Sequence, residues 1–212
     1  MEKIEIVKDG YRIILGFLII TLAVFYFWGI DAAIVPALLS CFFIYFFRNP
    51  NRPLPTDDSI LYSPADGTVM NIEEFFDDEY LNEEAKKVTI FLSVFNVHVN
   101  RAPMSGEIKY QRYTCGGYLP AYKDSASFVN ERHAIGLDNG KNRILVIQIA
   151  GLLARRIVSW VTLGKNIKQG ECYGMIKFGS STELVMPKTV EVLVKKGDKV
   201  KGGLTIIGRQ IS

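Results

Sequence analysis

Three short segments of the chain carry side chains that can act together as a nucleophile-activation relay. Asp66 stands in a Ser-Pro-Ala-Asp-Gly turn, His98 in the run Asn-Val-His-Val-Asn-Arg-Ala-Pro, and Ser180 directly after Gly179. In such a relay an acid orients an imidazole, the imidazole removes a hydroxyl proton, and the oxygen attacks a carbonyl carbon. From the residue types alone, a relay of Ser180, His98 and Asp66 competes with an ordinary serine hydrolase and with a purely structural role for these turns.

The surroundings of Ser180 disfavour an ordinary serine hydrolase. The run Gly179-Ser-Ser-Thr lacks the second glycine of a Gly-x-Ser-x-Gly elbow. The chain contains two histidines, and the other one, His133, follows Asn-Glu-Arg, where we expect a solvated loop. The missing elbow makes an ordinary serine hydrolase the weaker alternative.

The rest of the composition disfavours several other kinds of site. The cysteines Cys41, Cys115 and Cys172 form no Cys-x-x-Cys pair, so the sequence signals neither a zinc site nor a redox motif. The formal net charge is +3, without a basic run of the kind that binds nucleic acid. We expect reduced cysteines, no metal and no nucleic-acid partner.

Short strands must position these residues, because the chain after residue 52 reads as β-rich. Its apolar and β-branched runs are short and end at Gly, Asn or Lys-Gly turns, which is typical of strands. The clearest runs are Val88–Val94, Ile144–Ile149, Arg156–Leu163 and Val190–Val194. The polar stretch Glu79–Lys87 is expected to be a loop or a short helical turn.

One segment of this region occurs twice. Val161–Gly170 resembles Val194–Gly203, and the glycines at 164 and 170 recur at 197 and 203. A strand, a Gly-Asx turn and a Lys-x-Gly turn form a hairpin signature. Two copies predict a mainly β fold, a compact sandwich or flattened barrel built from duplicated hairpins.

The repeat also supports a noncatalytic alternative, a membrane-tethered β domain of the carrier or adaptor kind. Biotinyl and lipoyl carrier domains use such repeats, but they present a lysine at a hairpin tip. Lys188 follows a proline and does not fit that pattern. Adaptors usually carry long coiled coils, and this chain has no heptad run.

The N-terminus carries two apolar segments that predict a membrane anchor over residues 1–52. Ile13–Ile30 and Ala32–Phe47 contain no charged residue, and only Asp31 stands between them. One helix through both would be about 50 Å long, against a hydrocarbon core of about 30 Å. We therefore expect two helices joined by a tight turn. Their lengths fit either a full crossing or a shallow insertion, and residues 53–212 form the catalytic domain.

Positive charge flanks this pair on both sides and is missing from the turn. The flanking basic residues are Lys3, Lys8, Arg12, Arg48 and Arg52. Basic flanks stay on the cytoplasmic side of a membrane. We expect a protein of the cell membrane whose second domain faces the cytoplasm.

Taken in this order, the segments resemble the short form of the phosphatidylserine decarboxylase family, including its archaeal archaetidylserine decarboxylase relatives. Supporting runs are Asn-Glu-Arg at 130–132 and Gln-Ile-Ala-Gly at 148–151, and the detailed likeness extends over residues 63–208. The resemblance implies a proenzyme in which Ser180 attacks the carbonyl carbon of Gly179, with His98 as base and Asp66 orienting it. An ester forms, and elimination then leaves chains 1–179 and 180–212, which are expected to stay together as a heterodimer.

The same resemblance implies the cofactor and the reaction. Ser180 becomes a covalent pyruvoyl group, which forms a Schiff base with the amine of a serine phospholipid and accepts electrons as CO₂ leaves. The substrate would be phosphatidylserine or archaetidylserine, and His98 would reprotonate the carbanion. Arg101 is the candidate for binding a lipid phosphate or carboxylate, because guanidinium matches both. Longer family members carry a second histidine at the place of Arg101, and often an arginine at the place of Ser181.

Overall fold

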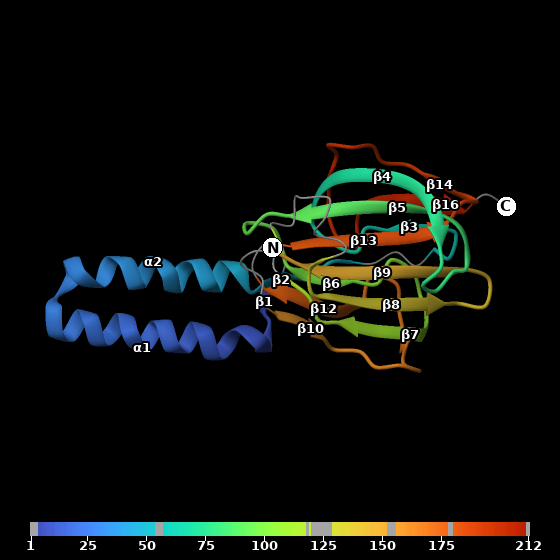
Figure 1. The fold of residues 1–212 in the computed structure, drawn as a ribbon. Helices are drawn as coiled ribbons and strands as arrows, with labels where there is room; N and C mark the ends of the chain where they lie inside the picture. The colour runs from blue at the N-terminus through green and yellow to red at the C-terminus, as the bar shows by residue number, and fades with distance from the viewer. Residues whose placement is uncertain are drawn as a thin grey trace. The chain divides into compact units, whose positions relative to one another are not determined.

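The computed structural model describes residues 4–53, 57–117, 119, 129–151, 156–177 and 180–210. The chain divides into two units, Met1–Arg52 and Pro53–Ser212. The first is a pair of helices and the second is built of strands (Figure 1). The predicted fold class, mainly β with an N-terminal apolar helix pair, is confirmed.

The helix pair consists of α1 (Tyr11–Trp28) and α2 (Ile30–Phe46), separated by Gly29 alone. Gly29 has φ of 83°, a conformation that favours glycine, so one residue is enough to reverse the chain. Asp31, expected between the helices, lies in the first turn of α2. A carboxylate in the first turn of a helix complements the helix dipole.

The two helices contact each other, and the segments before α1 and after α2 pair with each other. Thr21 Oγ1 lies 3.2 Å from Ser40 Oγ, and the rings of Phe17 and Phe43 are 4.6 Å apart. A short 3₁₀ turn (Lys8–Gly10) precedes α1, and the strands β1 (Ile4–Ile6) and β2 (Arg48–Pro50) pair antiparallel. Within the described residues, Lys8–Trp28 is the helix that is long and apolar enough to cross a membrane.

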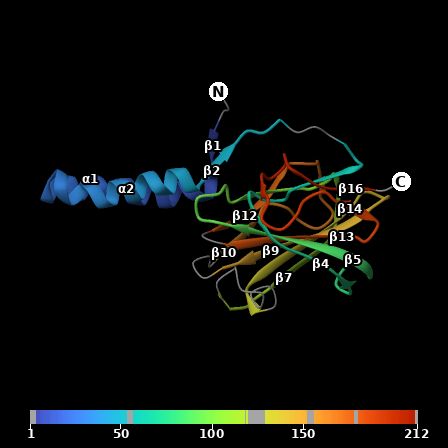
Figure 2. The same cartoon turned by 90° about the horizontal axis from the view of Figure 1, so that it is seen from above.

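The second unit is organised around one antiparallel sheet of eight strands. Their order is β11 (Asn166–Ile167), β7 (Gly106–Thr114), β8 (Arg132–Asp138), β9 (Arg143–Ala150), β13 (Ser180–Pro187), β5 (Glu83–Leu92), β4 (Gly67–Asp77) and β15 (Lys199–Val200). The sheet is strongly curled, as Figures 1 and 2 show from two directions. β13 runs through its middle, between β9 and β5.

Two three-stranded sheets cover the inner face of this sheet. One has the order β10 (Arg156–Ser159), β12 (Cys172–Lys177) and β6 (Val99–Arg101), and the other β14 (Val190–Val192), β16 (Ile206–Gln210) and β3 (Ile60–Tyr62). The main core lies between the large sheet and these two: Leu184 and Met186 of β13 pack with Tyr173 and Ile207. Val185 belongs to a second cluster on the other face.

One predicted element is wrong. The stretch Glu83–Lys87, expected in a loop or helical turn, is the first half of β5. It is held as a strand by pairing on both sides, with β4 and β13. Lys87 is neutralised across the sheet by Glu73, 2.6 Å away, so its charge does not prevent burial beside the sheet.

The duplicated segment occupies equivalent places at the two edges of the large sheet. The four glycines that recur in the two copies have positive φ: Gly164 81°, Gly170 74°, Gly197 95° and Gly203 72°. The copies contain β11 and β15, which pair with β7 and β4 and not within a hairpin of their own. The same two backbone bonds recur, since Gly164 N donates to Ile108 O and Gly197 N donates to Val69 O, both at 2.8 Å.

The duplication extends beyond the segment that the sequence revealed. Tyr62 N donates to Pro103 O at 3.0 Å and Arg101 N donates to Pro64 O at 2.9 Å, so β3 and β6 exchange equivalent bonds. The two small sheets have matching orders, β14-β16-β3 and β10-β12-β6. The second unit is therefore two similar halves that meet at β9 and β13.

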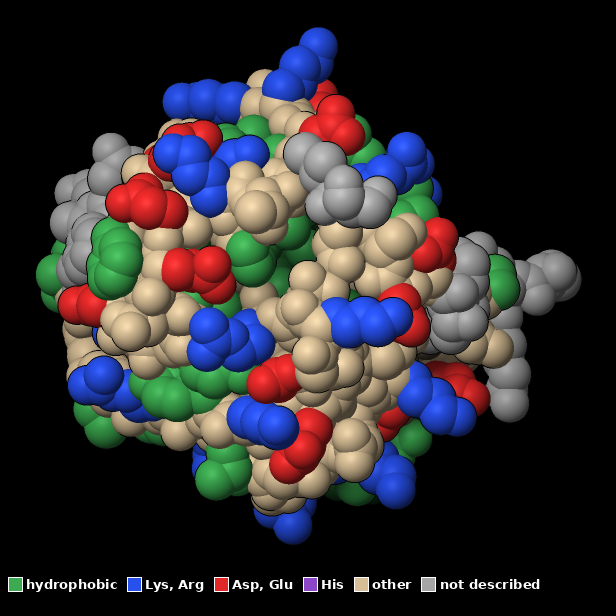
Figure 3. All heavy atoms as spheres, turned by 90° about the vertical axis from the view of Figure 1, so that its right-hand side faces the viewer, with side chains coloured by type: hydrophobic (Ala, Val, Ile, Leu, Met, Phe, Trp, Pro, Cys, Tyr) green, Lys and Arg blue, Asp and Glu red, His purple; other side chains and the backbone are tan. Residues whose placement is uncertain are grey.

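The face of the molecule in Figure 3 carries positive and negative side chains interspersed. Ion pairs in this unit include Lys188 with Glu74 at 3.0 Å and Lys109 with Asp138 at 3.7 Å. No histidine colour is visible on that face, in line with the burial of both histidines. Such a mixed surface is typical of a face exposed to water.

Candidate active site

Ser180 is the first residue of β13 and is completely buried. It pairs with Leu92 on one side and Ala150 on the other. Because side chains alternate along a strand, Ser180 points to the same inner face as Thr182 and Leu184. Its Oγ makes no hydrogen bond within the described part of the chain. Gly179, the predicted cleavage partner, lies outside the described residues.

His98 is also completely buried and lies where the chain enters β6. Its carbonyl accepts a hydrogen bond from Ile176 N at 3.3 Å, which fixes it beside the end of β12, four residues before Ser180. Its Nδ1 lies 2.9 Å from the carbonyl oxygen of Asn96. A carbonyl only accepts, so Nδ1 carries the proton and Nε2 is the basic nitrogen of the neutral ring.

Asp66 lies at the same end of the large sheet as Ser180. Thr68 of β4 and Ser181 of β13 are both aligned with Phe91 of β5. The residues just before them therefore flank one end of β5, and strand spacing places Asp66 roughly 10 Å from the Ser180 backbone. Gly67 is required there, because a Cβ would stand 2.2 Å from the carbonyl oxygen of Phe91.

One oxygen of the Asp66 carboxylate has a structural role. Asp66 Oδ1 accepts a hydrogen bond from Gly202 N at 2.8 Å. In the other half of the duplication, Ser105 Oγ accepts from Gln169 N at 3.0 Å in the equivalent turn. A hydroxyl serves as well as a carboxylate for this bond. His98 Nδ1 donates to the carbonyl oxygen of Asn96. The role of Asp66 as the acid that orients His98 therefore stays a prediction.

A chain of buried polar side chains runs across the inner face of the sheet. Asn100 Nδ2 donates to Thr182 Oγ1 at 3.1 Å, and Gln148 Nε2 donates to Asn100 Oδ1 at 2.8 Å. Gln148 Oε1 lies 3.1 Å from His133 Nδ1, and His133 Nε2 lies 3.0 Å from Gln111 Nε2. Sequence reasoning missed this network.

The expectation that His133 lies in a solvated loop is wrong. His133 is in β8 and only 3% exposed. Burial lowers its pKa, with the hydrogen bond to Gln148 acting in the opposite direction. Because Gln148 offers Oε1, His133 Nδ1 donates, and Nε2 accepts from Gln111; the ring is neutral.

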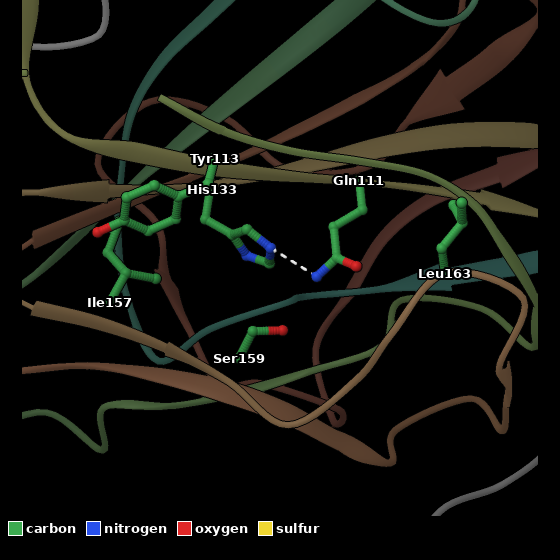
Figure 4. A pocket seen from close by; sticks show the side chains of 6 residues that line it. All are labelled: Gln111, Tyr113, His133, Ile157, Ser159 and Leu163. Carbon is green, nitrogen blue, oxygen red and sulfur yellow. Dashed lines mark hydrogen bonds between the residues drawn. The ribbon is translucent and has the colours of Figure 1, made fainter. Parts of the chain in front are cut away.

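His133 and Gln111 line a pocket of about 440 Å³ (Figure 4). The other lining residues are Tyr113, Ile157, Ser159 and Leu163. Ile157 also packs against Ala150 and Ile176. Ala150 pairs with Ser180 and Ile176 bonds to His98, so the pocket is separated from the catalytic candidates by one apolar layer.

Arg101 is buried, at 5% exposure, and its Nη1 donates to the carbonyl oxygen of Gly170 at 3.1 Å. This contact anchors the guanidinium in the duplicated turn. The predicted role in binding a lipid head group is not tested by it and stays a prediction.

Comparison with known proteins adds a family match over most of the chain. The family model described as phosphatidylserine decarboxylase matches residues 39–208. A phosphatidylserine decarboxylase proenzyme of Carboxydothermus hydrogenoformans is 47% identical over 98% of both chains. The proenzyme of Symbiobacterium thermophilum is 43% identical over 99% of this chain and 97% of its own, and that of Syntrophus aciditrophicus 46% over 96% of both.

Proposed function

The chain belongs to the phosphatidylserine decarboxylase family and is a carboxy-lyase, and from this premise we propose that it matures by cutting itself between Gly179 and Ser180. The mature enzyme then decarboxylates a serine phospholipid, phosphatidylserine or archaetidylserine, to the ethanolamine lipid. The observation that carries the proposal is a completely buried serine hydroxyl without a hydrogen-bond partner in the described residues, on the face of β13 that points toward β6.

The first step is transfer of an acyl group from nitrogen to oxygen. His98 Nε2 takes the proton of Ser180 Oγ, and Oγ attacks the carbonyl carbon of Gly179. The C–O bond forms, the C–N bond breaks, and the proton passes from His98 to the departing nitrogen. Removal of water around a buried hydroxyl favours this internal nucleophile over hydrolysis.

The second step separates the two chains. A base removes the Cα proton of Ser180, the Cβ–Oγ bond breaks, and the chain 1–179 leaves with a new carboxylate. Water then adds to the resulting dehydroalanine and ammonia departs, which leaves a ketone at the start of the chain 180–212. Each cut consumes one water and releases one ammonia.

The surroundings of Ser180 fit the pyruvoyl group that the family implies. Ser180 Oγ makes no hydrogen bond within the described part of the chain, so its loss removes none there. Its partners on the neighbouring strands, Leu92 and Ala150, are apolar and completely buried. The pyruvoyl ketone would supply the electron sink for departure of CO₂.

The protein groups around this site would orient the substrate and move the proton. His98 would return a proton to the substrate carbon, because its Nε2 is the ring nitrogen that can exchange one. We keep Arg101 as the candidate for the lipid phosphate. Asp66 Oδ1 accepts from Gly202 N, and we keep Asp66 as the candidate acid that orients His98.

The helix pair would hold the enzyme at the membrane. The side chains of α1 are not buried within its unit, and α1 is about 27 Å long, close to the thickness of a hydrocarbon core. A lipid substrate stays in the bilayer, so an anchored enzyme meets it there. We propose that the anchor keeps the second unit on the cytoplasmic side, as the basic flanks indicate.

Release of CO₂ from vesicles containing phosphatidylserine tests the activity. We expect release by the wild-type chain and by Ser181→Ala, whose side chain points to the opposite face, and no release by Ser180→Ala. Release by Ser180→Ala at the wild-type rate would contradict the proposed cofactor. A chain that is never cut and never releases CO₂ would favour the noncatalytic carrier or adaptor alternative.

A further inference from the structure

One buried amide touches all three segments that carry the catalytic candidates. Asn100 stands two residues after His98. Its Nδ2 lies 3.1 Å from Thr182 Oγ1, two residues after Ser180, and 3.4 Å from the carbonyl oxygen of Pro64, two residues before Asp66. Asn100 and Thr182 are completely buried.

The contact between Asn100 and Thr182 matters because their strands, β6 and β13, belong to different sheets. β6 lies in a small sheet and β13 in the large one, so no ladder of backbone bonds sets the distance between them. The turn before Asp66 has a backbone bond of its own to β6, from Arg101 N to Pro64 O. The bond between Asn100 and Thr182 is thus a polar link from β6 to the strand of Ser180.

The orientation of the Asn100 amide is set by the rest of the buried network. Gln148 Nε2 donates to Asn100 Oδ1, which forces the NH₂ group of Asn100 toward Thr182 and Pro64. His133 Nδ1 donates to Gln148 Oε1, and Gln111 Nε2 donates both to His133 Nε2 and to Val161 O. In this series Gln111 donates to His133, His133 to Gln148, Gln148 to Asn100 and Asn100 to Thr182 of β13.

We propose that Asn100 is a positioning residue for self-cleavage, and that Gln148 and His133 fix the direction of its amide. The inference rests on the proposed cleavage at Gly179–Ser180. Asn100 holds the β13 backbone against β6, which keeps Ser180 Oγ within reach of the imidazole of His98. A buried network of this kind specifies one arrangement only while every member is satisfied.

Cleavage of the freshly synthesised full-length chain tests this role. The full chain is made by cell-free translation in the presence of detergent, and the fraction cut is followed with time on denaturing gels. We expect Thr182→Val, which keeps the shape and removes the hydroxyl, to slow cleavage at least tenfold. Thr182→Ser restores the hydroxyl and should cleave within threefold of the wild-type rate.

Asn100→Asp tests the other side of the same bond. The aspartate keeps an oxygen for Gln148 and presents a second oxygen to the carbonyl oxygen of Pro64, which needs a donor, and Thr182 must reverse the direction of its hydrogen bond. We expect cleavage at least tenfold slower. Combining Asn100→Asp with Thr182→Val should slow cleavage by less than the product of the two single effects, because both remove one interaction.

Gln169 provides a matched control. It is a buried amide whose Nε2 donates to Pro103 O at 3.1 Å, in the turn of Ser105 and not in the turn of Asp66. Gln169→Glu should lower the thermal midpoint as Asn100→Asp does, measured with Ser180→Ala present, and leave the cleavage rate within twofold. Wild-type cleavage rates in both Thr182→Val and Asn100→Asp would overturn the positioning role and leave self-cleavage standing. A wild-type chain that stays whole would overturn both.

Discussion

Asp66 has a structural bond that can be separated from its proposed catalytic role. Its Oδ1 accepts from the Gly202 backbone, as Ser105 Oγ accepts from Gln169 in the equivalent turn. Ser105 therefore shows which side chain this turn tolerates without a charge. An uncharged acceptor at position 66 should preserve the turn and remove only what the carboxylate does.

Asp66→Ser should keep the fold and slow self-cleavage by about 100-fold or more, the scale of losing acid–base assistance. Asp66→Ala should slow cleavage similarly and also lower the free energy of unfolding by about 1 kcal/mol, the value of one hydrogen bond. Unfolding is measured in urea with Ser180→Ala present, and cleavage on denaturing gels.

Ser105→Ala is the control for Asp66→Ser, with a similar loss of stability and cleavage at the wild-type rate. If Asp66→Ser cleaved as fast as the wild type, the carboxylate would have no part in activating His98.

The buried imidazole of His133 makes stability depend on pH. Burial lowers its pKa below the ordinary value of 6.5, so below about pH 6.5 the unfolded chain takes up the proton first. The neutral His133 ring therefore contributes its full stabilisation of the fold above about pH 6.5. This contribution decreases as the pH falls toward the pKa of His133 in the folded chain. With Ser180→Ala present, the free energy of unfolding should fall between pH 7.5 and 5. His133→Asn should reduce this slope, and an unchanged slope would show that His133 does not titrate as a buried neutral ring.

The catalytic candidates could be predicted from the sequence, but the buried hydrogen-bond network could not. Ser180, His98 and Asp66 stand in recognisable motifs. Gln148 offered a signal, a lone amide within an apolar strand, because a buried polar group needs a partner. Its partner His133 follows a polar run, and only the register of β8 against β9 brings the two together.

At the scale of elements, β13 joins the two chains that the cut would create. Residues 180–212 contain β13, which has eight register pairs with β5 and six with β9, both in the chain 1–179. They also contain β16, which pairs with β3. A central strand with both edges paired and its side chains buried should not leave after one peptide bond is cut.

The fragments 1–179 and 180–212 should therefore elute together from a size-exclusion column in detergent and separate only in denaturant. Both should be found in one peak by denaturing gel. Elution of the smaller fragment alone under native conditions would contradict the pairing of β13.

Element boundaries were predicted less well than element types. The positive-φ glycines at 164 and 197 fixed the duplicated turns, because few other residues adopt that conformation. The strand pairing of Glu83–Lys87 could not be predicted locally, since the ion pairs of Lys87 and Glu83 are made with other strands, at Glu73 of β4, Glu183 of β13 and Arg143 of β9. The matching turn at Ser105 escaped notice because Ala-Pro-Met-Ser-Gly and Ser-Pro-Ala-Asp-Gly share only two residues.

At the scale of the whole molecule, we expect the two units to have separable tasks. The second unit has its own core and contains every catalytic candidate. Removing residues 1–52 should leave self-cleavage within about threefold of the full chain. It should lower CO₂ release from phosphatidylserine vesicles by at least tenfold, while release from detergent-solubilised lipid changes little. Undiminished activity on vesicles would show that the helix pair is not needed to reach the substrate.

The proposed maturation cuts the peptide bond between Gly179 and Ser180 and converts Ser180 into a group with a ketone. Intact mass of the purified full-length protein, beside Ser180→Ala, tests it most directly. We expect two chains, 1–179 and 180–212, the smaller lighter by one ammonia than a chain beginning with serine, and a whole chain for Ser180→Ala. A single uncut wild-type chain, or a smaller chain that begins with an ordinary serine, would contradict the account.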